Sequence, residues 1–175
     1  MLKQYLTRYT MTTIQQFRDS KLITDGSVVG FYEREFYVFS NFSSFQVQWE
    51  GHVWPTSEHA YQAARFFDSS PELVQKIKDA RSAHEAFEIA QGNKQYQREG
   101  WVEMKTAVML EICRHKLQQN PYVFHKLMLT NDEYLVEDSP VDSFWGWGAD
   151  RQGRNELGKV WMKLREEVRN NELRG

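Results

Sequence analysis

The stretch after Pro55 carries a carboxylate, an amide and a guanidinium at helical spacing. If this stretch is a helix, Glu58, Gln62 and Arg65 fall at positions i, i+4 and i+7 and form one polar stripe. A carboxylate in the first turn of a helix is kept ionised by the helix dipole, and it can activate a water or stabilise positive charge on a sugar ring. A solvated helix face with one internal hydrogen bond explains the same spacing, and His59 fits an ordinary hydrogen-bonded helix histidine.

The run 101–117 places a lysine within an apolar stripe. At 100° per residue the apolar positions of this run lie on one face, formed by Trp101, Met104, Val108 and Ile112. Lys105 lies near the middle of that stripe, so its ammonium either reaches outward to water or ends in a partly dry pocket. In a dry pocket, desolvation lowers the pKa of a lysine and frees its amine to attack a carbonyl or imine carbon. Lys116, close to the end of the run, is expected to be solvated or to pair with backbone carbonyls.

A third group of residues forms a loop rich in glycine and tryptophan, 142–153. Glycines let a backbone approach a ligand closely, and the indoles of Trp145 and Trp147 are flat surfaces on which a ring can stack. Asn155 and the N–H groups after it open a helix, which is a site suited to anions. The loop has neither the Gly-Lys-Ser/Thr of a Walker A motif nor a GxGxxG pattern. A ligand-binding loop and a loop whose indoles only fill the core remain equally good interpretations.

A single domain is expected to position these groups. The chain has 175 residues, enough to bury a core without a disulfide or a metal, and its 41% hydrophobic and 26% charged residues are ordinary for a globular protein. Aromatic residues reach 14%, including six Trp, which serves core packing first and also provides walls for planar ligands. The net charge of −2 argues against a general nucleic-acid-binding protein.

The composition also predicts the compartment and the absence of a metal site. The five histidines show no HxH or HExxH pairing, and the single cysteine, Cys113, fits a reducing compartment. No apolar run reaches the roughly 18 residues of a membrane span. The N-terminal residues lack the apolar core of a signal peptide. We therefore expect a cytoplasmic protein that needs no metal or cofactor and does not associate with membranes.

Hydrophobic periodicity changes along the chain from strand-like to helix-like. Strands are expected at 28–32, 36–39, 45–49, 52–54 and 133–137, and helices at 57–67, 71–80, 82–92, 101–117, 121–129 and from 155 onward. The predicted fold class is α+β: a single helix-rich domain over 28–170 with a small, mainly antiparallel sheet from the N-terminal half. Residues 1–27 are expected to be an N-terminal extension, in which 13–19 could form a short helix.

Taken together, these motifs resemble the signature of the NADAR (YbiA-like) N-glycosidase family. The resemblance covers about residues 28–168, nearly the whole chain, with the motifs in the family's order. It is carried by Phe-Ser-Asn-Phe at 39–42, Trp-Pro-Thr-Ser-Glu-His at 54–59, Tyr-Gln-Ala at 61–63, Trp101-x-x-x-Lys105-x-x-x-Met109, Asp142-x-x-Trp145-Gly-x-Gly and Gly153-x-Asn155-x-Leu157-Gly158.

The resemblance implies a YbiA-like fold and the hydrolysis of N-glycosides. One branch of the family acts on phosphoribosylaminopyrimidine intermediates of riboflavin biosynthesis and releases ribose 5-phosphate. Another branch removes ADP-ribose from guanine in nucleic acid, so a small phosphoribosyl or ADP-ribosyl compound and ADP-ribosylated nucleic acid are the alternative substrates. Both bonds join a sugar carbon to an exocyclic amine, and such glycosylamines can open to an imine that a lysine can attack. A module that binds ADP-ribose or NAD without cleaving it is the rival from another class.

The resemblance also implies site residues. The catalytic residues would be Glu58, Lys105 and Asp142, with one of the carboxyls protonating the leaving amine or guiding water. The indoles of Trp101 and Trp145 would line the heterocycle, and Arg65, Asn41 or Asn155 would bind the phosphate or the ribose hydroxyls. The full set of predicted substrate contacts is Asn41, Ser57, His59, Gln62, Arg65, Trp101, Trp145, Gly146 and Asn155. Many relatives carry lysine where this chain has Arg65, and the first 27 residues have no counterpart in the family pattern.

Overall fold

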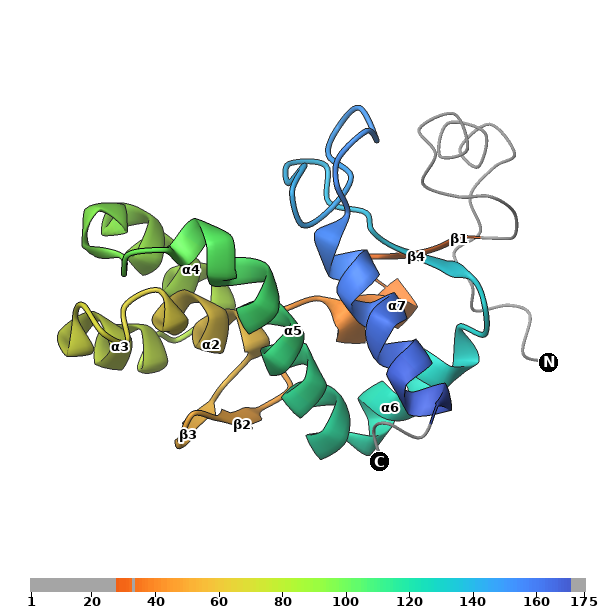
Figure 1. Ribbon diagram of the computed structural model, residues 1–175, viewed down its shortest axis with the longest axis horizontal. Helices are drawn as coiled ribbons and strands as arrows, with labels where there is room; N and C mark the ends of the chain where they lie inside the picture. Colours follow the sequence, from red (N-terminus) through yellow and green to blue (C-terminus); the bar gives the residue numbers. More distant parts are fainter. Residues whose placement is uncertain (1–27, 33, 171–175) are drawn as a thin grey trace. The chain divides into compact units, whose positions relative to one another are not determined.

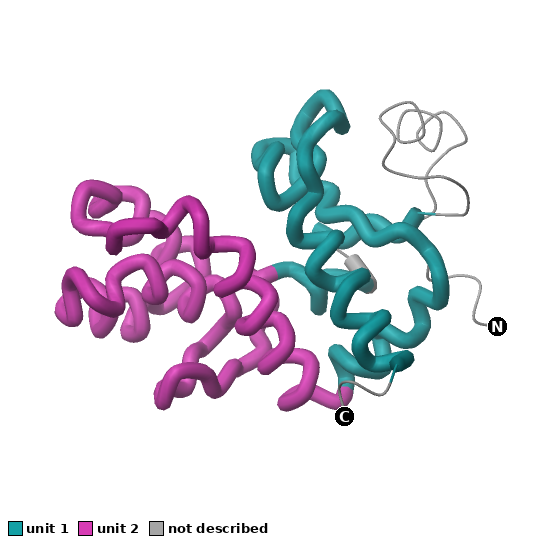
Figure 2. Tube along the Cα trace, in the orientation of Figure 1, with its two compact units in different colours: residues 1–40, 122–175 teal, residues 41–121 magenta. Residues whose placement is uncertain are grey.

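The computed structural model describes residues 28–32 and 34–170, which divide into two compact units. The first unit comprises residues up to Ser40 together with those from Tyr122 onward, and the second runs from Asn41 to Pro121 (Figure 2). The N-terminal extension expected at 1–27, with its short helix at 13–19, lies outside the described residues.

The second unit consists of helices gathered on a two-stranded hairpin (Figure 1). Strands β2 (Val47–Trp49) and β3 (His52–Trp54) pair antiparallel, with Gln48 opposite Val53. Glu50 and Gly51 both have positive φ, 50° and 72°, as a tight two-residue hairpin turn requires. The helices are α2 (Ser57–Ala64), α3 (Pro71–Lys78), α4 (Ala83–Gly92) and α5 (Trp101–Gln119), with the short 3-10 helix η2 (Lys94–Tyr96) before α5.

Helix α2 lies at the centre of the second unit. It packs against α3, α4, α5 and both strands of the hairpin. All eight of its residues are buried, although four of them carry polar side chains. It begins at the cap residue Thr56, whose hydroxyl accepts a hydrogen bond from the backbone N–H of His59, and it ends at Ala64, three residues before the predicted end.

The first unit is built on a parallel pair of strands covered by a helix. Strand β1 (Val28–Phe31) pairs with β4 (Tyr134–Glu137) in parallel register. Helix α7 (Glu156–Arg169) packs on β4, and α6 (Pro121–Leu129) and the 3-10 helix η1 (Arg34–Phe39) complete this unit. Trp161 of α7 donates its indole N–H to the Phe39 carbonyl at 2.9 Å and lies 5.1 Å from the Phe39 ring.

The α+β fold class is confirmed, whereas two details of the prediction differ. Residues 36–39 belong to η1 and are not a strand: the 3-10 spacing brings the rings of Phe36 and Phe39 to the same side, stacked 5.8 Å apart in the core. Core packing therefore outweighs the strand propensity of this aromatic run. The expected hairpin is present, but β1 pairs with a strand from the C-terminal half in parallel, a long-range pairing that local periodicity does not encode.

No helix within residues 28–32 and 34–170 is long and apolar enough to cross a membrane.

Replacing Gly158 with alanine should destabilise the first unit. A Cβ at this position would overlap the carbonyl oxygen of Leu135 in β4 and the side-chain amide of Asn155. We expect the free energy of unfolding to fall by about 1–3 kcal/mol, measured by urea denaturation. The matched control is Gly92→Ala at the end of α4, where a Cβ would meet nothing within 4 Å. Equal stability of the two variants would contradict the close packing of α7 on β4.

Candidate active site

A hydrogen-bonded stripe of polar side chains runs along α2. The Nε2 group of Gln62 donates to Oε1 of Glu58 at 2.7 Å, and Nη1 of Arg65 donates to Oε1 of Gln62 at 2.8 Å. The three residues, called the α2 stripe below, are only 5%, 3% and 6% exposed. The interpretation of this spacing as a solvated helix face is therefore wrong, and its internal hydrogen bonds are buried.

The guanidinium of Arg65 fixes the direction of the hydrogen bonds along the α2 stripe. Arg65 can only donate, so the amide oxygen of Gln62 must face it and the amide nitrogen must face Glu58. An N–H directed at Glu58 favours the carboxylate over the protonated acid. Burial lowers the pKa of Arg65, while Tyr61 and the negative charge of Glu58 raise it, so the two ends of the stripe interact electrostatically.

Three polar atoms in and beside the α2 stripe are buried without a hydrogen bond to any described residue: Asn41 Oδ1, Ser57 Oγ and Arg65 Nε. The backbone carbonyl of Asn41 accepts from the backbone N–H of Glu58 at 3.0 Å, and the side-chain nitrogen of Asn41 donates to the sulfur of Met109 at 3.2 Å. Leaving such an atom without a partner costs about 1–3 kcal/mol, which makes a polar ligand a natural explanation. Because Oδ1 only accepts, its partner must be a donor such as a hydroxyl or an amine and not a phosphate.

Helix α5 packs against α2 and also contacts Asn41. Trp101 packs against Tyr61 of α2 with ring centroids 5.2 Å apart. Two turns later, Met109 contacts Asn41, which is bonded through its carbonyl to Glu58. Lys105 lies one turn from each of these contacts, on the side of α5 that faces α2, and its side chain is partly buried. Asn41, Ser57, the α2 stripe, Trp101 and Lys105 therefore all belong to the second unit, in which Asn41 is bonded to Glu58 and Trp101 packs on α2.

The buried stripe of α5 differs from the predicted one. Met104 and Val108 are partly exposed, and Met109 and Cys113 are buried in their place. Lys105 lies between Trp101 and Met109 at spacings of four residues, so a lysine within the buried stripe remains the correct description.

Lys116 is fully buried, so the expectation that it is solvated is wrong. Its ammonium nitrogen donates to Ser43 Oγ at 2.7 Å and lies 5.4 Å from the centre of the Phe45 ring. Burial lowers the pKa of Lys116 to about 7, an effect slightly opposed by Cys113. The apolar residues Ile112 and Cys113, one turn before Lys116, indicated a buried face, but the position of Lys116 near a helix end favoured the solvated interpretation.

His59 connects α2 to the turn before α4. Its Nε2 contacts the carbonyl of Ala80 at 3.1 Å, and its Nδ1 contacts the hydroxyl of Thr56 at 2.8 Å. A carbonyl only accepts, so Nε2 carries the proton and Nδ1 accepts from Thr56. Burial lowers the pKa of His59, opposed by the Ala80 carbonyl and by Glu85. Both ring nitrogens of His59 are engaged in these contacts, so neither is free for the predicted substrate contact. We therefore assign His59 to positioning α2.

The remaining predicted residues belong to the loop of the first unit. Asp142 Oδ1 accepts from the backbone N–H groups of Phe144 and Trp145 at 2.8 and 2.7 Å, so this carboxylate shapes the loop. Trp145 is partly exposed and packs edge-on against Phe144, whereas Trp147 is buried and donates to Asp138. One indole therefore fills the core and the other stays accessible. The catalytic role of Asp142 and the stacking role of Trp145 stay predictions.

Asn155 organises the loop rather than an anion site. Its side chain accepts from the N–H of Glu137 at 3.0 Å and donates to the carbonyl of Leu135 at 2.8 Å. The next two backbone N–H groups, of residues 156 and 157, donate to loop carbonyls, so they are not available to an anion. Gly146 is required by close packing, because a Cβ there would lie 2.6 Å from the Glu137 carbonyl.

Residues 28–32 and 34–170 contain no cluster of three His, Cys, Asp or Glu side chains that could hold a metal ion.

Three relatives resemble this chain over most of its length. N-glycosidase Npun_R5314 of Nostoc punctiforme is 39% identical over 133 residues, which cover 75% of this chain and 85% of that protein. N-glycosidase YbiA of Escherichia coli is 30% identical over 148 residues, 83% of this chain and 91% of that protein. Riboflavin biosynthesis protein VVA0006 of Vibrio vulnificus is 41% identical over 129 residues, 74% of this chain, but the match spans only 35% of that longer protein.

A solved structure and a family model agree with these relatives. The NMR structure of Escherichia coli YbiA superposes with a TM-score of 0.77 at 30% identity, covering 87% of this chain and 91% of that one. The NADAR domain model matches residues 30–169, almost the whole range over which a single domain is expected. The chain belongs to the NADAR domain family. The family resemblance is thereby confirmed, and the expected enzyme class, N-glycosidase, is confirmed by the names of these relatives.

Lys116 should make the stability of the protein depend on pH. Between the folded pKa of about 7 and the ordinary lysine value of 10.5, the unfolded chain binds a proton that the folded protein releases. Stability therefore rises with pH in this window, by at most about 1.4 kcal/mol per pH unit. Below pH 7 Lys116 is protonated in both states, so it causes no pH dependence there and its burial destabilises the protein most. Lys116→Met should flatten this rise and stabilise the protein at pH 7.

Urea denaturation at pH 6, 7, 8 and 9 measures the effect, with the exposed Lys76→Met as the control for loss of a positive charge. Identical slopes for wild type and Lys116→Met would show that the amine is not buried in solution.

Proposed function

We propose that the protein hydrolyses the N-glycosidic bond between a phosphorylated ribose and the exocyclic amine of a pyrimidine-type heterocycle, releasing ribose 5-phosphate. The observation that carries this proposal is the buried carboxylate of Glu58, which accepts from Gln62, itself held by Arg65. Two unpartnered polar atoms, Asn41 Oδ1 and Ser57 Oγ, belong to the same region. The choice of substrate is supported by relatives named riboflavin biosynthesis proteins in Vibrio vulnificus and Zea mays.

In this reaction Glu58 acts as a carboxylate. The N–H of Gln62 and the nearby charge of Arg65 both favour the ionised form, so Glu58 stabilises positive charge on the sugar carbon and accepts a proton from the attacking water. The bond between the sugar carbon and nitrogen breaks, the hydroxyl of water joins the carbon, and the proton ends on the leaving amine.

Lys105 offers a covalent route to the same products. Its amine attacks the sugar carbon of the ring-opened imine, the heterocyclic amine leaves with a proton, and a lysine imine of the sugar remains. Water then releases the sugar and restores the amine. This route is supported by the spacing of Lys105, which lies one turn from Trp101 and one turn from Met109, two residues of α5 that contact Tyr61 and Asn41.

The unpartnered atoms suggest how the sugar is held. Asn41 Oδ1 accepts from a ribose hydroxyl, and Ser57 Oγ donates to or accepts from its neighbour. The N–H of Arg65 at Nε, which has no partner among the described residues, is a donor suited to the phosphate or a further hydroxyl. Trp101, which packs against Tyr61, provides an aromatic surface for the heterocycle.

Glu58→Gln should lower the rate of ribose 5-phosphate release by about 100-fold or more, because the amide keeps the shape of the side chain but cannot stabilise the developing charge. The assay uses the riboflavin-pathway phosphoribosylaminopyrimidine as substrate, and Glu72→Gln on the exposed start of α3 is the matched control. Undiminished turnover in both Glu58→Gln and Lys105→Ala would refute the mechanism.

The same assay distinguishes the alternatives. Release of ADP-ribose from modified guanine in nucleic acid, with no turnover of the aminopyrimidine, would assign the protein to the other branch of the family. Tight binding of ADP-ribose by calorimetry, without release of any base, would identify a sensor instead.

Borohydride should trap a sugar on Lys105 during turnover. Borohydride supplies hydride to the lysine imine and turns it into a stable secondary amine, which peptide mass spectrometry locates. We expect the adduct on the peptide containing Lys105 and its loss in Lys105→Ala. Turnover without any adduct at Lys105 would leave direct attack by water as the route.

A further inference from the structure

A segment that no sequence motif singled out holds the far end of the α2 stripe. Nη2 of Arg65 donates to Oε1 of Gln97 at 3.1 Å, while Nη1 of the same guanidinium holds Gln62. The next residue in the chain, Arg98, donates its backbone N–H to the carbonyl of Arg65 at 2.7 Å.

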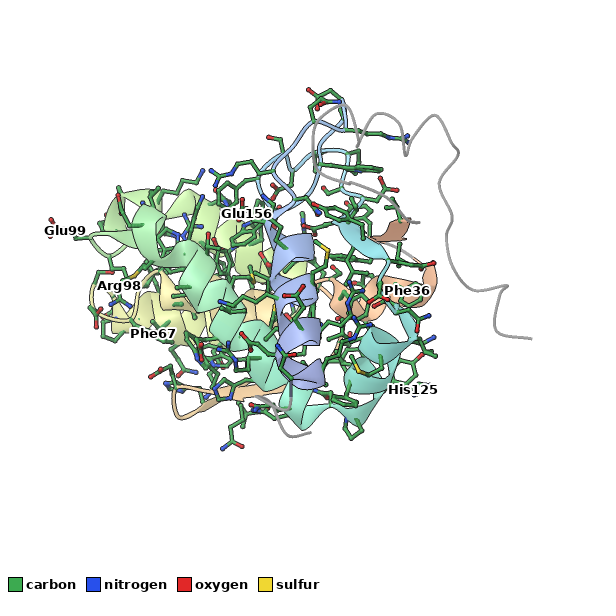
Figure 3. All side chains as sticks on the ribbon, turned by 45° about the vertical axis from the view of Figure 1, so that its right-hand side comes forward. Phe36, Phe67, Arg98, Glu99, His125 and Glu156 are labelled. Atoms are coloured by element: carbon green, nitrogen blue, oxygen red, sulfur yellow. The ribbon has the colours of Figure 1, made fainter. Side chains whose placement is uncertain are left out.

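Residues 93–100 are anchored to α2 independently of Gln97. The side chain of Arg98 pairs with Asp68, just beyond the end of α2; Figure 3 labels Arg98 and Phe67, the residue before Asp68. The segment then leads directly into α5 at Trp101, which packs on Tyr61. The backbone near Gln97 is therefore fixed, so its side chain can act on Arg65 without being needed to close the fold.

The orientation of the Gln97 side-chain amide follows from the same argument as that of Gln62. A guanidinium only donates, so each amide must present its oxygen to Arg65. With an acceptor on either side, the planar guanidinium is held in one orientation, and Gln62 cannot flip without losing its bond to Arg65. The N–H of Gln62 then always points at Glu58.

We propose that Gln97 is a positioning residue for catalysis: it aims Arg65 at Gln62 and so keeps the Glu58 carboxylate oriented. This inference rests on the proposed function, because it assigns Gln97 a role in the reaction that Glu58 carries out. Gln97 acts on Glu58 only through Arg65 and Gln62.

Gln97→Leu tests the proposal, because it removes the acceptor and keeps a side chain of similar size. We expect kcat to fall about tenfold with KM changed less than twofold, as for a misaligned catalytic group. Gln97→Glu keeps an oxygen facing Arg65 and should recover most of kcat. Gln95→Leu, an exposed change in the same segment, is the matched control.

A second readout does not depend on turnover. In a 15N-labelled protein, restricted rotation should give separate guanidinium signals for Arg65 in wild type and Gln97→Glu, and averaged signals in Gln97→Leu. If Gln97→Leu does not fold, Gln97→Ala takes its place in both measurements.

The outcomes separate the two proposals. Wild-type kcat and guanidinium signals in Gln97→Leu would overturn the positioning role and leave the proposed function intact. A wild-type protein that cleaves no glycosylamine would overturn the proposed function, while the guanidinium signals would still decide whether Gln97 holds Arg65. Equal losses in Gln97→Leu and Gln97→Glu would also overturn the proposal, because they would show that an acceptor at this position is not sufficient.

Discussion

The burial of α2 on all sides is the constraint on which the second unit depends. A helix of eight residues is too short to be stable alone, so α2 is held by the elements packed around it. Its polar side chains have no access to bulk water, and each one needs a partner from the protein or a ligand. Gln62 and His59 obtain their partners from the protein, whereas Ser57 Oγ has none among the described residues. A polar helix at the centre of a core is costly for stability and is the kind of feature that function explains.

The surroundings of α2 fix the helix at both ends. At its start, Thr56 caps the helix and His59 ties it to Ala80, so the backbone of Glu58 is fixed. At its end, Arg65 is held through its carbonyl and its guanidinium by residues 97 and 98. A carboxylate positioned from both directions is preorganised for charge stabilisation, because little reorganisation is needed during the reaction.

Two lysines on α5 illustrate how environment separates structural from chemical roles. Lys105 is partly buried on the side facing α2, while Lys116, three turns later, is fully buried between Ser43 and Phe45. A low pKa alone would mark Lys116 as the reactive amine. Full burial and the hydrogen bond to Ser43 make Lys116 an anchor for the segment that carries Asn41, and the partial exposure of Lys105 is the reason why the proposed covalent route uses Lys105.

Sequence by itself determined the α+β class, the hairpin at Glu50-Gly51, most helices and the spacing that aligned Glu58, Gln62 and Arg65, because these depend on local periodicity, turns and caps. Local patterns do not encode what packs against a helix. Only the tertiary structure decided that the polar stripe is buried, that Phe36 and Phe39 lie in a 3-10 helix, that Lys116 is buried and that Gln97 holds Arg65. In each case the deciding contact joins residues distant in the sequence, or depends on which helix face the core covers, and burial then sets the charge state and the hydrogen-bond partner.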